Sequence, residues 1–141
     1  MSKLDVQKLI VHCSATRPDQ DIGASEIDRW HKNKGWSGIG YHYVIKRDGV
    51  LEEGRSRLKA GAHARGFNYK SLGICLVGGL ESDGEIQEGV DSYTPAQMTT
   101  LRSLLRYLKM SHPKAEVLGH RDLPNVAKAC PCFDVQQWFK E

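Results

Sequence analysis

Short apolar runs along the chain predict the strands of a sheet. Residues 8–13 are mostly apolar and lead into small polar residues, as in a buried strand that stops at the edge of a sheet. Residues 41–55 alternate in polarity around an Asp-Gly pair at 48–49, which is a strong hairpin signal. The apolar run at 71–79 ends in glycines and is typical of a central strand, and residues 116–120 form a further short strand.

Other segments have the spacing of helices. Residues 18–36 predict one short amphipathic helix, and residues 93–113 give the clearest signal, with Thr94 as the N-cap of a capping box and leucines along one face. A last helix is expected from about Asp134. Strands and helices together predict a single α/β domain over residues 1–141, with a central mixed β-sheet flanked by helices.

Length and composition limit the classes of protein that fit. A chain of 141 residues can bury its own core without covalent cross-links. It has neither a signal-peptide pattern at its start nor an apolar run of membrane-spanning length, so we expect synthesis in the cytoplasm, reduced thiols and no membrane partner. A net charge of +3 with scattered basic residues argues against nucleic-acid binding. We expect a monomer.

Candidate metal ligands lie where predicted strands end. His12 and His120 each terminate an apolar strand, and Cys130 follows after a loop. Two imidazoles and one thiolate leave a fourth tetrahedral position open for water, which is the pattern of a catalytic zinc site. The spacing makes such a site plausible without excluding a simpler interpretation, in which the histidines only make structural hydrogen bonds.

The Cys-Pro-Cys triplet at 130–132 also admits a redox interpretation. Cytosolic redox pairs usually have Cys-x-x-Cys spacing, and zinc fingers need two closely spaced ligand pairs. Zinc deaminases carry His-x-Glu and Pro-Cys-x-x-Cys motifs, which this chain lacks. Since Pro131 is expected to extend the chain, we predict that only Cys130 reaches a metal and that Cys132 is a packed, reduced thiol. Cys13 and Cys75 fit small buried hydrophobic residues.

Five stretches, in this order, closely resemble the zinc-dependent N-acetylmuramoyl-L-alanine amidases of type 2: IVHCSAT, GYHYVIKRDG, GAHARGFNYKSLGICLVGG, YTPAQMTTLRSLL and AKACPCFDV. Peptidoglycan recognition proteins are more distantly similar. The resemblance extends from about Leu9 to Trp138. It implies the amidase fold, a Zn²⁺ cofactor and hydrolysis of the amide bond between N-acetylmuramic acid and L-alanine in bacterial peptidoglycan. It also implies a phage or prophage endolysin that acts on the cell wall after release.

The resemblance assigns a role to five positions in this sequence. His12, His120 and Cys130 correspond to the zinc ligands of the family, and Tyr41 and Lys128 to its catalytic residues. The phenol of Tyr41 can both donate and accept a hydrogen bond, so it can orient a water and relay its proton. Lys128 would bring positive charge to the carbonyl oxygen, where negative charge develops.

Further positions match the family less firmly. His63 and Asn68 lie in an irregular glycine-containing loop at 58–71 and correspond to substrate-binding positions, although a surface histidine and a turn asparagine explain them as well. Cys75 stands where muropeptide-recycling members carry a glutamate, so glutamate acid-base chemistry is excluded there. Cys132 stands where a small hydroxyl residue is expected, and the loop between the last two ligands is longer than in the small phage enzymes.

Two other functions remain open. The chain could be a catalytically weak peptidoglycan-binding protein, although in the recognition proteins the loss of catalysis accompanies loss of the ligand cysteine, and Cys130 is present. It could also regulate a phage RNA polymerase, because the resembling phage enzyme does so.

Overall fold

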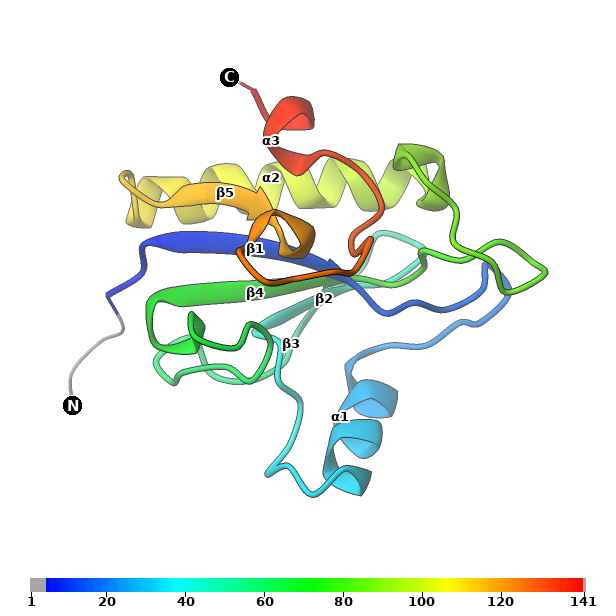
Figure 1. Cartoon of the computed structure of the whole chain (residues 1–141), viewed down its shortest axis with the longest axis horizontal. Helices are drawn as coiled ribbons and strands as arrows, with labels where there is room; N and C mark the ends of the chain where they lie inside the picture. Colours follow the sequence, from blue (N-terminus) through cyan, green and yellow to red (C-terminus); the bar gives the residue numbers. More distant parts are fainter. Residues whose placement is uncertain (1–4, 141) are drawn as a thin grey trace.

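The computed structural model describes residues 5–140 as a five-stranded sheet with helices on both faces (Figure 1). The ends of the predicted domain, at residues 1–4 and 141, lie outside this part of the chain. The strand order is β3-β2-β4-β1-β5, in which only the β2–β3 pair is antiparallel. The predicted α/β domain with a mixed sheet is confirmed. The strands are β1 (Lys8–Cys13), β2 (Tyr43–Ile45), β3 (Leu51–Glu53), β4 (Ser71–Leu76) and β5 (Glu116–Gly119).

The helices occur where the pattern predicts them. The longest, α2, lies along one face of the sheet together with α3, and α1 lies on the opposite face (Figure 1). Short 3-10 turns join the other elements. The helices are α1 (Ala24–Asn33), α2 (Pro95–Ser111) and α3 (Val135–Trp138), and the 3-10 turns are η1 (Asn68–Lys70), η2 (Val90–Ser92) and η3 (His120–Asp122).

Successive side chains of the central strand β1 point to opposite faces of the sheet. Leu9, Val11 and Cys13 belong to the core beneath α2, whereas Ile10 packs in a separate cluster on the other face. His12 follows Ile10 by two residues and therefore shares that second face. One face of β1 thus packs into the core beneath α2, and the other face carries the candidate ligand His12.

The N-terminus of α2 is tied directly to the sheet. Gln97 is fully buried, and its amide donates hydrogen bonds to the carbonyls of Ile45 (3.1 Å) and Val77 (2.9 Å). Its carbonyl oxygen accepts from the Thr94 backbone (3.0 Å), as the capping box predicts, and from the Arg47 guanidinium (3.2 Å). All four hydrogen-bonding positions of this amide are therefore used.

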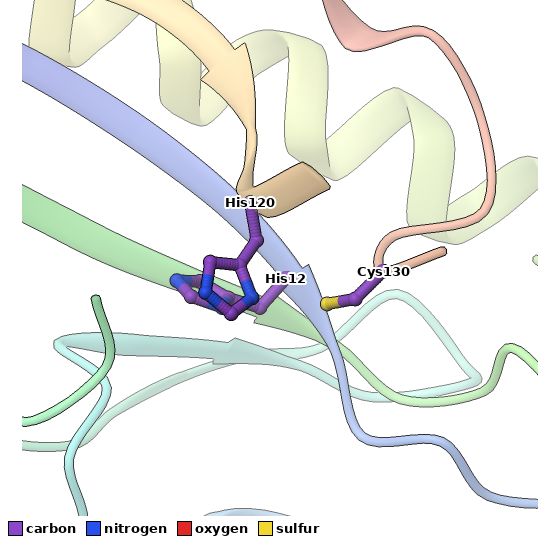
Figure 2. Close-up of side chains that lie close together, drawn as sticks. All are labelled: His12, His120 and Cys130. Carbon is purple, nitrogen blue, oxygen red and sulfur yellow. The ribbon is translucent and has the colours of Figure 1, made fainter. Parts of the chain in front are cut away.

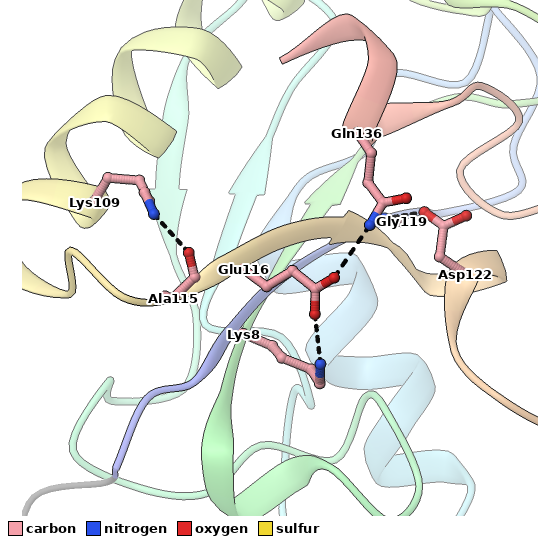
Figure 3. A network of polar contacts seen from close by, with 7 residues as sticks. All are labelled: Lys8, Lys109, Ala115, Glu116, Gly119, Asp122 and Gln136. Carbon is pink, nitrogen blue, oxygen red and sulfur yellow. Dashed lines mark hydrogen bonds and ion pairs between the residues drawn. The ribbon is translucent and has the colours of Figure 1, made fainter. Parts of the chain in front are cut away.

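A polar network on the surface connects β1, β5 and α3 (Figure 3). Lys8 pairs with Glu116 at 2.6 Å, and Gln136 donates to the same carboxylate at 3.2 Å. Such exposed pairs contribute little to stability. In the same region the Asp122 carboxylate accepts from the Gly119 backbone at 2.9 Å, which fixes the chain at the point where β5 ends.

Between residues 5 and 140, no helix has both the length and the apolar character needed to cross a membrane.

Replacing Gln97 with Met tests how strongly this buried amide holds α2 on the sheet. The substitution keeps the side-chain size but leaves buried polar groups unpaired, so we expect the free energy of unfolding to fall by about 2–3 kcal/mol. Urea unfolding followed by circular dichroism measures the change. The matched control is Gln137→Met on the exposed side of α3, for which we expect a change within about 0.5 kcal/mol. Equal effects of the two substitutions would contradict the assigned role.

Candidate active site

Parallel strand pairing brings the two candidate histidine ligands together. Val11 on β1 is paired with Gly119 on β5, and each of these residues is followed directly by a candidate ligand, His12 or His120. Their rings lie 4.5 Å apart between centroids. One ligand atom from each of His12, His120 and Cys130 lies within 4.8 Å of the others, and Figure 2 shows the Cys130 sulfur directed toward the two rings. The three predicted ligands therefore converge.

The backbone around Cys130 is held from several sides. The Cys13 N–H donates to the Cys130 sulfur at 3.1 Å, and the Arg121 N–H donates to the Cys130 carbonyl at 2.8 Å. The Tyr93 hydroxyl donates to the next carbonyl, that of Pro131, at 2.6 Å. A loop that has little regular structure thus presents its thiol at a fixed place beside β1.

The expectation that Pro131 extends the chain is wrong. The Cys130–Pro131 peptide is cis, Cys132 has a φ of 73°, and the Cys132 N–H donates to the Ala129 carbonyl at 2.6 Å. The segment therefore turns, because local hydrogen bonds close it. Cys132 is nevertheless buried as expected, in the core beneath α2, with its sulfur 3.7 Å from the Gly79 carbonyl oxygen.

Burial keeps the two candidate histidine ligands neutral. It lowers the pKa of His12 well below the ordinary value, and the nearby His63, His120 and Lys128 lower it further. The pKa of His120 is lowered by burial and then by Lys128. A neutral imidazole retains the lone pair that a metal needs. Two neutral imidazoles and one thiol within reach of each other are a donor set that fits a zinc ion.

The thiols of Cys13, Cys130 and Cys132 lie close together next to this site. Hydrogen bonding to Cys13 and burial both raise the pKa of Cys130 and of Cys132. Without a cation nearby, Cys130 and Cys132 therefore hold their protons more firmly than a free cysteine. A cation between His12 and His120 would favour the charge on Cys130, whose sulfur is the one that lies within 4.8 Å of both imidazoles.

Tyr41 lies beside the same group. Its ring centroid is 5.1 Å from that of His12 and 5.6 Å from that of His31. Burial raises the pKa of Tyr41 well above its ordinary value, and the thiols of Cys75 and Cys130 raise it further. The phenol therefore keeps its proton and can act as both donor and acceptor. Tyr41 lies just before β2, because this strand begins at Tyr43, two residues later than predicted.

A cavity of about 510 Å³ opens next to His120. Its walls come from the loop that carries His63 and Asn68 and from the loop that carries Lys128, with Trp36 at one side. The structure therefore brings both catalytic candidates and both substrate-binding candidates to the metal group.

The loop that carries His63 is well fixed. The side-chain oxygen of Asn68 accepts from the backbone N–H groups of His63 (3.0 Å) and Ala64 (2.9 Å). The His63 ring lies against two glycines, since a Cβ added at Gly61 or Gly73 would come within 2.5 or 2.6 Å of the ring. Asn68 thus has a structural task in addition to any contact with substrate.

Comparison with known proteins agrees with this geometry. The family described as N-acetylmuramoyl-L-alanine amidase matches residues 2–133. The endolysin of Enterobacteria phage T3 is 45% identical over 135 residues, which cover 96% of this chain and 86% of the relative. The chain belongs to the N-acetylmuramoyl-L-alanine amidase family. The predicted resemblance is confirmed.

Two solved structures share the fold of this chain. The endolysin amidase LysCS from Clostridium intestinale aligns with a TM-score of 0.76 at 31% identity, over 92% of this chain and 78% of the other. The bumblebee protein PGRP-SA aligns with a TM-score of 0.77 at 24% identity, over 98% of this chain and 82% of the other, and so shows the shared fold.

Sequence reasoning missed several residues around the site of this family member. Trp36 lines the cavity and packs 4.5 Å from the ring of His31, whose Nδ1 accepts from the Gly40 N–H at 2.9 Å. Ser71 contacts His63 at 3.2 Å. A tryptophan directly after the glycine that ends a helix was a usable signal for Trp36, but Ser71 is linked to the site only by the folded chain.

His42 allows a test of how burial controls the histidines of this family member. It is buried, its Nδ1 accepts from the Gly73 N–H at 3.0 Å, and its Nε2 donates to the Lys59 carbonyl at 2.8 Å. Burial lowers the pKa of His42 below 6.5. As the pH falls below 6.5, His42 becomes protonated in the unfolded chain while it stays neutral in the folded chain. The free energy of unfolding therefore decreases by up to about 1.4 kcal/mol per pH unit.

The matched variant is His42→Asn, whose amide oxygen can accept from the same backbone N–H but cannot titrate. Urea unfolding in the same chelator-containing buffer at pH 7 and pH 5 should show a smaller loss of stability in the variant than in the wild type. An identical pH dependence of the two proteins would contradict the assignment.

Proposed function

We propose that this chain is a zinc-dependent endolysin that hydrolyses the amide bond between N-acetylmuramic acid and L-alanine in bacterial peptidoglycan. The observation that carries the proposal is the convergence of His12, His120 and Cys130. His120 also lines the cavity whose wall carries Lys128. Membership in the amidase family supports the same reaction.

Each residue has a task that follows from its chemistry. His12, His120 and Cys130 would hold the zinc ion, which when bound supplies a Lewis acid that activates water and polarises a carbonyl. Tyr41 keeps its phenolic proton and lies beside His12, so it can orient the attacking water and pass on a proton. Lys128 is exposed at the cavity wall and can stabilise negative charge on the amide oxygen.

The cavity walls suit a substrate that combines sugar and peptide. Trp36 offers an aromatic surface, and Arg65 and Lys128 offer positive charge to the carboxylates of a stem peptide. Both ring nitrogens of His63 already have partners inside the protein, so His63 would meet the substrate through its ring edge. Asn68 retains its amide N–H groups for the substrate.

The enzyme would act on the cell wall after release, as expected of an endolysin. Its release, the monomeric state and the binding of a phage RNA polymerase stay predictions from the sequence.

Mass spectrometry of digested peptidoglycan tests the reaction itself. Purified protein with zinc should release stem peptides with a free L-alanine amino terminus and leave the glycan strands intact. New reducing sugar ends, or cuts within the stem peptide, would contradict the proposal.

The two thiols of the Cys-Pro-Cys triplet should differ in metal binding. We expect Cys130→Ser to lose zinc and activity, since the sulfur nearest the two imidazoles is removed, whereas Cys132→Ser should retain both. Elemental analysis of the purified variants measures the zinc, and chelation followed by zinc addition should abolish and then restore wild-type activity. Zinc lost only from Cys132→Ser would reverse the assignment.

Catalysis should be separable from metal binding. We expect Tyr41→Phe and Lys128→Ala to retain about one zinc per chain while turnover falls by roughly two to three orders of magnitude, because each removes one transition-state contact. Steady-state hydrolysis of purified peptidoglycan measures this. Tyr69→Phe and Lys114→Ala are matched controls on exposed residues and should leave turnover unchanged. Loss of zinc from Tyr41→Phe or Lys128→Ala would contradict the assigned roles.

A further inference from the structure

A chain of hydrogen bonds leads from His12 into the protein, away from the candidate metal ligands. His12 Nε2 lies 2.8 Å from His63 Nδ1, and His63 Nε2 lies 3.2 Å from the Ser71 hydroxyl. That hydroxyl donates to the Phe67 carbonyl at 2.8 Å. The two imidazole planes meet at 82°, so the His63 ring approaches His12 edge-on.

The Phe67 carbonyl, at the end of this series of hydrogen bonds, determines which atom donates in each of them. A carbonyl oxygen has no proton, so the Ser71 hydroxyl must use its only hydrogen toward Phe67. Ser71 can then only accept from His63, which places the single ring proton of a neutral His63 on Nε2. The Nδ1 atom of His63 is left as an acceptor, and His12 must carry its own proton on Nε2.

Geometry agrees with this assignment. A zinc ion bound to an imidazole lies about 2.0–2.1 Å from the nitrogen. On Nε2 of His12 such an ion would collide with His63 Nδ1, which occupies that direction at 2.8 Å. The Nδ1 atom of His12 is therefore the ring nitrogen that keeps a lone pair for a metal.

We propose that His63 is a positioning residue that holds the His12 proton on Nε2 and thereby selects Nδ1 of His12 as the metal-binding atom. The inference rests on the proposed zinc dependence only where affinity for zinc is concerned. The fixed loop supports it, because Asn68 anchors the His63 backbone and the glycines at 61 and 73 leave room for the ring in this one place.

The hydrogen bond from His12 to His63 fixes the orientation of the His12 ring as well as the position of its proton. An imidazole that donates its second N–H to a fixed acceptor cannot rotate freely, and removal of such a partner typically costs about 10- to 100-fold in metal affinity or activity. His63 therefore contributes to the site without touching the metal.

The first test needs no metal. In metal-free protein labelled with ¹⁵N-histidine, long-range ¹H–¹⁵N correlation at pH 7.5 identifies which ring nitrogen carries hydrogen. We expect the Nε2–H form for both His12 and His63, with the signals assigned through His12→Gln and His63→Asn. A dominant Nδ1–H form of His12 would overturn the inference, whether or not the protein proves to bind zinc.

The second test measures zinc affinity by competition with a chromophoric chelator. We expect His63→Leu, which removes the acceptor, to bind zinc about 10- to 100-fold more weakly than the wild type. His63→Asn can place its side-chain oxygen where Nδ1 was and should recover most of that loss. Wild-type affinity in His63→Leu would overturn the inference, since a merely space-filling residue would leave the affinity unchanged.

Ser71→Ala provides an independent variant if His63→Leu fails to fold. It keeps His63 but removes the partner that fixes its proton, so we expect an Nδ1–H population of His63 in the spectrum and weaker zinc binding. An unchanged spectrum together with unchanged affinity would contradict the role of the chain. Absence of zinc binding in the wild type would instead refute the proposed function, and the tautomer measurement on metal-free protein would still decide the inference.

Discussion

The parallel pairing of β1 with both of its neighbours is the constraint on which the site depends. The register that places Val11 beside Gly119 brings His12 next to His120, and the register with β4 places His12 beside Cys75. A one-residue slip of β1 would turn His12 into the core beneath α2, because side chains alternate between the two faces of a strand. Hydrophobic packing on one face thus fixes the position of the chemistry on the other.

Two loops, which carry Cys130 and His63, complete the site that the strand ends begin. Tyr93 holds the segment with Cys130 through the Pro131 carbonyl, and Asn68 holds the loop with His63. In both cases a single polar side chain satisfies backbone groups of an irregular segment, which regular secondary structure would otherwise do. The cavity beside His120 is therefore bounded by two loops of defined shape.

Much of this arrangement could be predicted from local patterns. The capping box at Thr94, the hairpin at 48–49 and the apolar run of β1 each depend on near neighbours, and each is confirmed. The candidate ligands could be named because parallel strands end at a common edge.

What the sequence could not predict depends on contacts between distant segments. Gln97 reads as a capping residue, but its bonds to the carbonyls of Ile45 and Val77 require the folded sheet. The turn after Cys130 and the link from His63 to Ser71 likewise have no local signature.

X-ray absorption at the zinc edge of the zinc-loaded protein tests the central claim most directly, since it reports the donor atoms themselves. We expect one sulfur at about 2.3 Å and two imidazole nitrogens at about 2.0–2.1 Å, with the remaining position filled by a light atom. A zinc ion with no sulfur neighbour, or with two, would contradict a site built from His12, His120 and Cys130.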